Sequence, residues 1–257
     1  MNRYFLQVSY NGTAYHGWQI QDNAITVQQV LNEKLSIILQ EKINATGAGR
    51  TDTGVHAKFF MVHFDTKKAI LDSALFIDKM NKLLPKDIAV YQLFKVHNEA
   101  NTRFDAVSRT YEYRIIRKKN PFLTDLAWNY RVSLNMDLMN QAAKILFEYQ
   151  DFTSFSKTGT QVKTNNCKIY EAQWFESDNN LLIFKIKADR FLRNMVRAIT
   201  GTLMDVGMGK ISLDDFRKII ESKNRSNAGF SVPAHGLFLT GIEYPKGVAL
   251  RSPQRSS

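Results

Sequence analysis

Cysteine is almost absent from this chain, which has one, Cys167, among 257 residues. A single thiol cannot form an internal disulfide, and this usage fits a reducing compartment. The first residues, MNRYFLQVSY, lack the long apolar segment and the small-residue cleavage site of a signal peptide. Apolar runs long enough to span a bilayer are also missing. These absences predict a cytoplasmic protein with no membrane association.

Negative charge is the second shortage. The chain has 24 Asp and Glu against 35 Lys and Arg, which leaves a net charge of +11 and an isoelectric point of about 9.6. Such a surplus favours a polyanionic partner, with nucleic acid the first candidate, although a merely basic soluble enzyme remains an alternative. The length and the hydrophobic share of 44% suffice for one large domain or two small ones with a buried core.

Hydrophobic periodicity predicts both strands and helices in residues 1–100. Strict alternation predicts strands, and a spacing of three or four residues predicts helices. A capping pair, Thr26 with Gln29, marks the start of the first helix, and Pro85 ends the second. The expected elements are a strand at 3–10, a helix at 26–38, a short strand at 42–46, a strand at 59–64, a helix at 76–84 and a strand at 88–96.

The predicted order of strands and helices in residues 101–250 is the same, so the order β-α-β-β-α-β occurs twice. Each half matches the ferredoxin-like plan. We therefore expect an α+β fold in which an N-terminal half, 1–100, and a C-terminal half, 101–250, join into one broad, mostly antiparallel sheet. Helices would cover one face, a catalytic cleft would lie between the halves, and the polar residues 251–257 would form a disordered tail. The elements expected in the second half are strands at 109–116, 169–175, 181–187 and 236–244 and helices at 138–149, 192–203 and 212–220.

The segment ATGAGRTDTGVHA, residues 45–57, sets Arg50 and Asp52 on a backbone with few other large side chains. Two phosphate-binding motifs fail here. A dinucleotide fingerprint needs a third glycine where Asp52 stands, and a P-loop starting at Gly49 needs Lys and then Ser or Thr directly after Gly54.

Two further interpretations of Asp52 stay open on pattern alone. The tripeptide Asp52-Thr53-Gly54 is that of aspartic proteases, whose two carboxylates share one proton. No second such tripeptide follows, so a dimer would have to supply it, and Arg50 would hold both carboxylates ionised. The other interpretation is a turn in which Asp52 bonds its own backbone and glycines supply the flexible positions.

The loop GAGRTDTGVHA closely resembles the active-site loop of the tRNA pseudouridine synthases of the TruA family. Five more blocks resemble that family in the family's order, so the resemblance covers nearly the whole chain. Two local departures, Thr53 in place of a common alanine and YNGT in place of YDGT, remove no group that the reaction needs. The blocks are SYNGTAYHGWQ, RFDAVSRTYEYRI, DFTSFSK, RFLRNMVRAITGTLMDVG and VPAHGLFL.

This resemblance implies isomerisation of uridine to pseudouridine at positions 38, 39 and 40 of the tRNA anticodon stem-loop, without cofactor or metal, by a homodimer. It implies that Asp52 is the essential aspartate, that Tyr111 stacks on the target uracil, that Arg197 pairs with the aspartate and that Arg50 helps to hold the flipped nucleotide. The chemistry fits these roles, because a carboxylate in a site with little water stays ionised only beside a cation. Stacking on an aromatic ring is worth about 1–3 kcal/mol per base.

Arginines at 190, 193 and 197 follow helical spacing, and we expect them along one face of the helix at 192–203. We interpret them as a phosphate-facing row, with Arg190 and Arg193 as RNA-binding candidates and Arg197 reaching the site. A solvated face is the alternative, just as Tyr111 has the alternative of an ordinary strand aromatic.

The histidines show no metal-site spacing with Cys167, so we expect no metal. We interpret His56 as a structural group beside the loop and not as part of a triad. Three function classes remain in play: a tRNA pseudouridine synthase, a non-catalytic RNA-binding protein of the same fold, and a dimeric aspartic protease.

Overall fold

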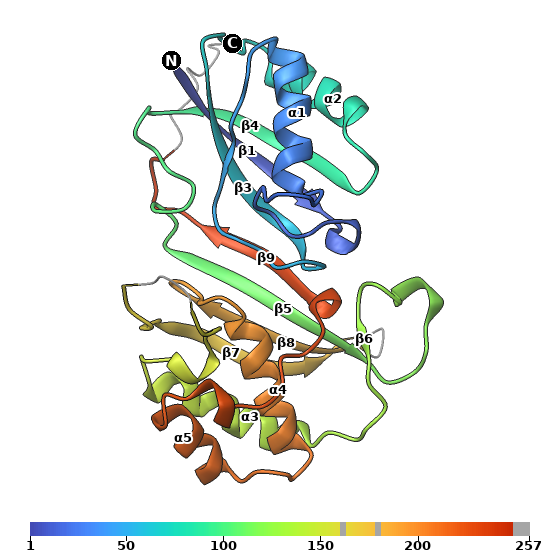
Figure 1. Ribbon diagram of the computed structural model, residues 1–257, viewed down its shortest axis with the longest axis vertical. Coiled ribbons are helices and arrows are strands. Elements are labelled where there is room, and N and C mark those ends of the chain that lie inside the picture. The colour runs from blue at the N-terminus through green and yellow to red at the C-terminus, as the bar shows by residue number, and fades with distance from the viewer. Residues whose placement is uncertain (160–162, 178–180, 249–257) are drawn as a thin grey trace, which may run out of the picture. The chain divides into compact units, whose positions relative to one another are not determined.

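The computed structural model describes residues 1–159, 163–177 and 181–248 (Figure 1). In this part of the chain there are five α-helices and a large, mostly antiparallel sheet of nine strands, which confirms the predicted α+β class. The residues group into two compact units. The first is Met1–Val107 together with the described residues from Leu239 onward, and the second is Ser108–Phe238. The tail expected at 251–257 lies outside the described residues.

The first unit is built on β1 (Asn2–Tyr10), which pairs antiparallel with β3 (His56–Thr66) and β4 (Ile88–Val96). Leu6 stands opposite Val62 on one side and Leu93 on the other. A two-residue strand, β2 (Thr46–Gly47), pairs with β3, and β9 (Leu237–Glu243) follows β3 in the strand order.

Two helices cover one face of these strands (Figure 1). Helix α1 (Val27–Leu39) begins as predicted, because the Thr26 side chain accepts a hydrogen bond from the Gln29 N–H. Helix α2 (Ser73–Leu83) ends before Pro85, also as predicted. Phe60 and Phe64 of β3 are buried, and the Phe64 ring stacks on Phe76 of α2 with ring centroids 6.4 Å apart.

The second unit pairs β5 (Ser108–Ile116) with β8 (Leu181–Ala188) and β8 with β7 (Ile169–Glu176), all antiparallel. A short strand, β6 (Trp128–Asn129), is parallel to β5. The helices of this unit lie on one face of its strands (Figure 1). They are α3 (Met136–Ile145), α4 (Met195–Gly207) and α5 (Leu213–Glu221).

Short 3₁₀ turns complete both units. They are η1 (Gly12–Ala14), η2 (Pro121–Leu123), η3 (Leu146–Glu148), η4 (Thr153–Phe155), η5 (Arg225–Asn227) and η6 (Ala234–Gly236). The last helical turn expected up to residue 149 is therefore 3₁₀ and ends at Glu148.

Two predicted elements begin three or four residues later than expected, and two others, β3 and α2, begin three residues earlier. Of the strand expected at 42–46, only Thr46 is in a strand, and the rest is irregular. The helix expected from residue 192 begins at Met195, because Asn194 has left-handed backbone angles of φ 69° and ψ −2°. A left-handed residue cannot continue a right-handed helix.

The division of the chain also differs from the expected halves. The structure groups residues 101–107 and the chain from Leu239 onward with the first unit. Several contacts explain this. The Val107 N–H donates to the Glu243 carbonyl over 2.8 Å, and the Tyr244 hydroxyl donates to the Thr102 carbonyl over 2.6 Å. The Tyr244 ring also meets Phe5 edge to face, with centroids 5.8 Å apart.

Candidate active site

Asp52 lies in the loop that connects β2 to β3. The side chain is half-buried, and its neighbour Thr51 is buried. The Val55 N–H donates to the Asp52 main-chain carbonyl over 3.1 Å, which closes a tight backbone turn that begins at Asp52. This bond joins two main-chain groups, so it is not the turn given above as the structural alternative, in which the Asp52 side chain bonds its own backbone.

The chain just after β1 fixes this loop from the other side. The Trp18 N–H donates to the Thr51 carbonyl over 3.3 Å, and the Gly54 N–H donates to the Tyr15 carbonyl over 3.3 Å. The hydroxyls of Tyr10 and Thr51 lie 2.9 Å apart. Hydrogen bonds thus hold the residues on both sides of Asp52, so the carboxylate is carried by a well-supported backbone.

A cluster of aromatic rings supports the same region. Trp18 and Phe60 have ring centroids 4.5 Å apart, and Tyr10 meets Phe60 edge to face at 5.7 Å. All three rings are buried. A Cβ on Gly47 would lie 2.6 Å from the Trp18 ring, so only glycine fits where β2 passes this cluster. The rigidity of the loop therefore comes from packing as well as from hydrogen bonds.

His56 is 1% exposed and begins β3. Its Nδ1 accepts a hydrogen bond from the Gly12 N–H over 3.0 Å. A ring nitrogen that accepts carries no proton, so this bond selects the neutral tautomer with its proton on Nε2. The contact agrees with the structural interpretation of His56, which joins β3 to the turn after β1.

Arg50 is exposed on the same loop, two residues before Asp52. A Cβ on the adjacent Gly49 would meet no other atom within 4 Å. Open space beside a glycine backbone suits the close approach of a ligand.

Tyr111 lies on β5, half-buried, and pairs with Ile186 of β8. Its ring meets Phe191 edge to face, with centroids 5.2 Å apart and planes at 88°. Tyr113, two residues on, is fully buried and donates to the Pro233 carbonyl over 2.9 Å. Burial raises the pKa of the Tyr113 phenol, and the charge of Arg197 lowers it in part. Tyr113 is therefore the core aromatic of this strand, while Tyr111 is only partly covered.

Arg197 lies in the first turns of α4 and is half-buried. Its Nε donates to the Val232 carbonyl over 2.7 Å, and the Val232 N–H donates back to the Arg197 carbonyl over 3.3 Å. Two bonds in opposite directions fix the base of this side chain. The guanidinium therefore has a defined direction before any ligand arrives.

The predicted helical row of Arg190, Arg193 and Arg197 is wrong, because only Arg197 lies in α4. The other two precede the helix in the turn that Asn194 closes. Arg193 is exposed, and its carbonyl accepts from the Lys157 N–H over 3.0 Å. Arg190 is half-buried, and its Nη1 donates to the Thr164 carbonyl over 3.2 Å.

The predicted site residues thus fall into two groups. Arg50 and Asp52 share a loop of the first unit, and Tyr111 and Arg197 belong to the second. Sequence reasoning missed the supporting residues Tyr10, Trp18 and Val232. The aromatic residues at positions 10 and 18 are visible in the sequence, but the Val232 contact spans 35 residues and has no local signal.

Among the described residues, no group of three or more His, Cys, Asp and Glu side chains could hold a metal ion. Cys167 is buried, and burial raises the pKa of its thiol to about 12. A thiol protonated at neutral pH is a poor nucleophile and a poor ligand. Within the same described part of the chain, no helix has the length and apolar character needed to cross a membrane.

Comparison with known proteins adds independent evidence. The family model described as tRNA pseudouridine synthase matches residues 7–105 and 142–245. "tRNA pseudouridine synthase A" of Parabacteroides distasonis is 51% identical over 96% of this chain and 97% of the relative. The protein of the same name from Bacteroides fragilis is 50% identical over 96% and 98%, and that from Clostridium acetobutylicum is 41% identical over 93% and 98%.

A solved structure, a dye-decolorizing protein from V. cholerae, covers 93% of this chain and 91% of its own at 9% identity, but its TM-score of 0.18 carries no argument. The family match and the identities extend through both units and include the loop that carries Asp52. This chain belongs to the tRNA pseudouridine synthase family.

Proposed function

We propose that this protein isomerises uridine to pseudouridine in the anticodon stem-loop of tRNA, at positions 38, 39 and 40. Isomerisation of uridine in tRNA follows from the family to which the chain belongs. The observation that carries the proposal is the extent of this likeness, about half of all residues over nearly the full length of the chain. The net charge of +11 suits a polyanionic substrate.

Asp52 is proposed as the essential nucleophile or base. The reaction breaks the N1–C1′ bond, rotates the base and joins C5 to C1′. An ionised carboxylate starts it either by attack on the sugar or base or by removal of a proton. The support is local: Asp52 is half-buried on a loop held by hydrogen bonds and aromatic packing, next to the open backbone of Gly49.

Three further side chains are proposed to bind the nucleotide. Tyr111 stacks on the extruded uracil, Arg197 pairs with the aspartate, and Arg50 holds the flipped nucleotide. The partly covered Tyr111 ring and the backbone-anchored Arg197 suit these roles. Extrusion of a stacked base costs roughly a few kcal/mol, which such contacts offset. Pairing of Arg197 with Asp52 is supported by the family resemblance.

The protein is further proposed to work in the cytoplasm as a homodimer that binds one tRNA without cofactor or metal. The dimer and the reaction without a cofactor rest on the family resemblance, and the cytoplasm rests on the single cysteine, which fits a reducing compartment. Sedimentation of the protein alone and with tRNA measures the stoichiometry. A monomer that binds tRNA at a ratio of one to one would overturn the dimer.

The activity itself is tested by tritium release from tRNA labelled with [5-³H]uridine, because C5 loses its hydrogen when it bonds to C1′. We expect the wild-type protein to release tritium from the labelled tRNA. We also expect mapping of the product to find pseudouridine at positions 38, 39 and 40. Tritium release with modification elsewhere in the tRNA would support the isomerase activity and contradict the anticodon stem-loop as its target.

A further inference from the structure

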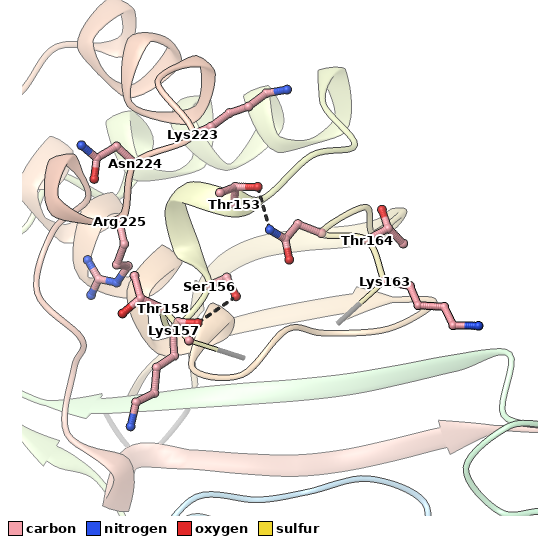
Figure 2. Close-up of a pocket in the computed structure, with 11 residues that line it drawn as sticks. Thr153, Ser156, Lys157, Thr158, Lys163, Thr164, Lys223, Asn224 and Arg225 are labelled. Carbon is pink, nitrogen blue, oxygen red and sulfur yellow. Dashed lines mark hydrogen bonds between the residues drawn. The ribbon is translucent and has the colours of Figure 1, made fainter. Parts of the chain in front are cut away.

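A cavity of about 350 Å³ lies in the second unit, and none of the proposed active-site residues lines it. This size is within the range of about 300–1,000 Å³ that is usual for ligand sites. The cavity is formed by residues in and directly after η4, by residues 163–165 and by the chain that leads into η5 (Figure 2). Its lining residues are Thr153, Ser156, Lys157, Thr158, Gly159, Lys163, Thr164, Asn165, Lys223, Asn224 and Arg225.

Charge of one sign distinguishes this cavity. Four of the lining residues are basic, and within the described structure none of the lining residues is acidic. The others contribute hydroxyl, amide and backbone groups, which donate hydrogen bonds to anions. Lys223 is partly compensated, because it pairs with Asp151 over 3.0 Å and points away from the other basic side chains in Figure 2.

Arg225 is a cation of the cavity, and hydrogen bonds hold its guanidinium in place. Its Nη1 donates to the carbonyls of Ala228 and Gly229 over 3.3 and 3.1 Å, and its Nη2 donates to the Ser231 hydroxyl over 2.8 Å. All of these acceptors are neutral. Burial lowers the pKa of this guanidinium, which means that its charge is poorly solvated. An anion that reached it would gain a charge-assisted hydrogen bond without meeting a competing carboxylate among the described contacts.

Figure 2 shows Arg225, Ser156, Lys157 and Thr158 at one end of the cavity and Lys163 and Thr164 at the other. A chain of phosphates offers an anionic group to each end. The backbone of the cavity also connects to the arginines before α4. Lys157 donates its N–H to the Arg193 carbonyl, and the Thr164 carbonyl accepts from Arg190.

The network continues to the helix that carries Arg197. The Ser231 hydroxyl, bonded to Arg225, also accepts from the Asn194 Nδ2 over 2.6 Å. The next residue, Val232, holds the Arg197 Nε. Hydrogen bonds therefore connect the segment that holds Arg225 in the cavity to the first turn of α4, which carries Arg197.

We propose that this cavity binds phosphates of the tRNA backbone outside the uridine that reacts, with Lys157, Lys163 and Arg225 as the contacts. The identity of the RNA rests on the proposed function. The site positions the tRNA and carries no sequence information, since phosphate contacts set register while base contacts specify.

The test is the salt dependence of tRNA binding by the double variant Lys157→Gln/Lys163→Gln. Removal of one phosphate contact reduces the slope of log affinity against log salt by about 0.7–0.9. We expect a slope smaller by about 1 to 2 and an affinity about tenfold lower at moderate salt. The control Lys144→Gln/Lys218→Gln removes the same charge from exposed lysines of the second unit outside the cavity and should change the slope much less.

Thermal unfolding of both double variants checks that the fold is unchanged, and the control variant should show single-turnover tritium release at the wild-type rate. A wild-type slope in the cavity variant, with tritium release intact in the wild type, overturns the phosphate site and leaves the isomerase standing. A reduced slope in the cavity variant, with no tritium release by the wild-type protein, supports the phosphate site and overturns the isomerase.

The last experiment is competition of inorganic phosphate with bound tRNA, because a free phosphate offers the same chemistry as a backbone phosphate. We expect that it displaces tRNA no better than chloride at equal ionic strength. Saturable displacement at micromolar phosphate, abolished in the cavity variant, would identify a small-molecule site and overturn the assignment to RNA.

Discussion

Gly17 lies against the backbone of Thr51, so that a Cβ on Gly17 would lie 2.3 Å from the Thr51 carbonyl oxygen. Gly17 also has φ of +83°, in the region that favours glycine. The next residue, Trp18, donates its N–H to the same oxygen over 3.3 Å. The peptide that precedes Asp52 is thus held by two consecutive residues of the segment after β1.

Replacement of Gly17 by alanine should therefore disturb the catalytic loop. Strain at positive φ and a clash with backbone predict a loss of about 3 kcal/mol in the free energy of unfolding, with a fall in activity. The matched control is Gly209→Ala, where φ is +70° but a Cβ would meet nothing within 4 Å. It should cost only about 1 kcal/mol. Urea unfolding measures both, and equal losses would mean that contact with Thr51 does not matter.

Local pattern predicted much of the fold. Alternation placed β4 at 88–96 and the hairpin of β7 and β8 almost to the residue, because side chains on a half-buried strand follow a period of two. Thr26 and Pro85 marked helix ends through local backbone bonding, which depends only on neighbouring residues.

The errors arose where distant contacts decide the structure. Arg190 and Arg193 have helical spacing, but Asn194 takes left-handed angles and bonds Ser231, which is 37 residues away. The cavity likewise combines three segments whose lysines are individually unremarkable in the sequence. Asp52 was found through its resemblance to a known loop, since spacing alone left a turn and a protease dyad open.

His63 should make the stability of the first unit depend on pH. It is buried on β3, the Thr102 N–H donates to its Nδ1 over 3.3 Å, and the Thr102 hydroxyl donates to the Thr46 carbonyl over 3.1 Å. Burial, with the charge of Arg3, lowers the pKa of His63 to about 4. Because the folded-state pKa is below the unfolded value, the stabilisation is complete above about pH 6.5 and is lost as the pH falls toward 4.

We expect the free energy of unfolding to fall by about 2 kcal/mol from this group between pH 7 and pH 5. His235, whose pKa is also lowered by burial, adds a loss of the same sign. The comparison with His63→Asn isolates the first contribution, since asparagine keeps an acceptor and does not titrate. Urea unfolding at the two pH values should show a smaller difference in the variant, and an unchanged difference would contradict the assignment.

Tyr111 should contribute to catalysis through its ring. Loss of a stacking partner costs about 1–3 kcal/mol, so Tyr111→Ala should lower kcat/KM about 10- to 100-fold. Tyr111→Phe keeps the ring and its contact with Phe191 and should retain tRNA affinity. Steady-state kinetics with both variants separates the ring from the hydroxyl. Near wild-type kcat/KM in the alanine variant would remove Tyr111 from the site.

The charge of Asp52 is the central claim, and single-turnover tritium release at saturating enzyme tests it most directly. Asp52→Asn keeps the shape of the side chain and removes its charge, and it should lower the release rate by more than about 10³-fold while tRNA affinity stays within a few-fold of wild type. Asp78→Asn, an exposed change on α2, should release tritium at the wild-type rate. Release from Asp52→Asn at the wild-type rate would contradict the account.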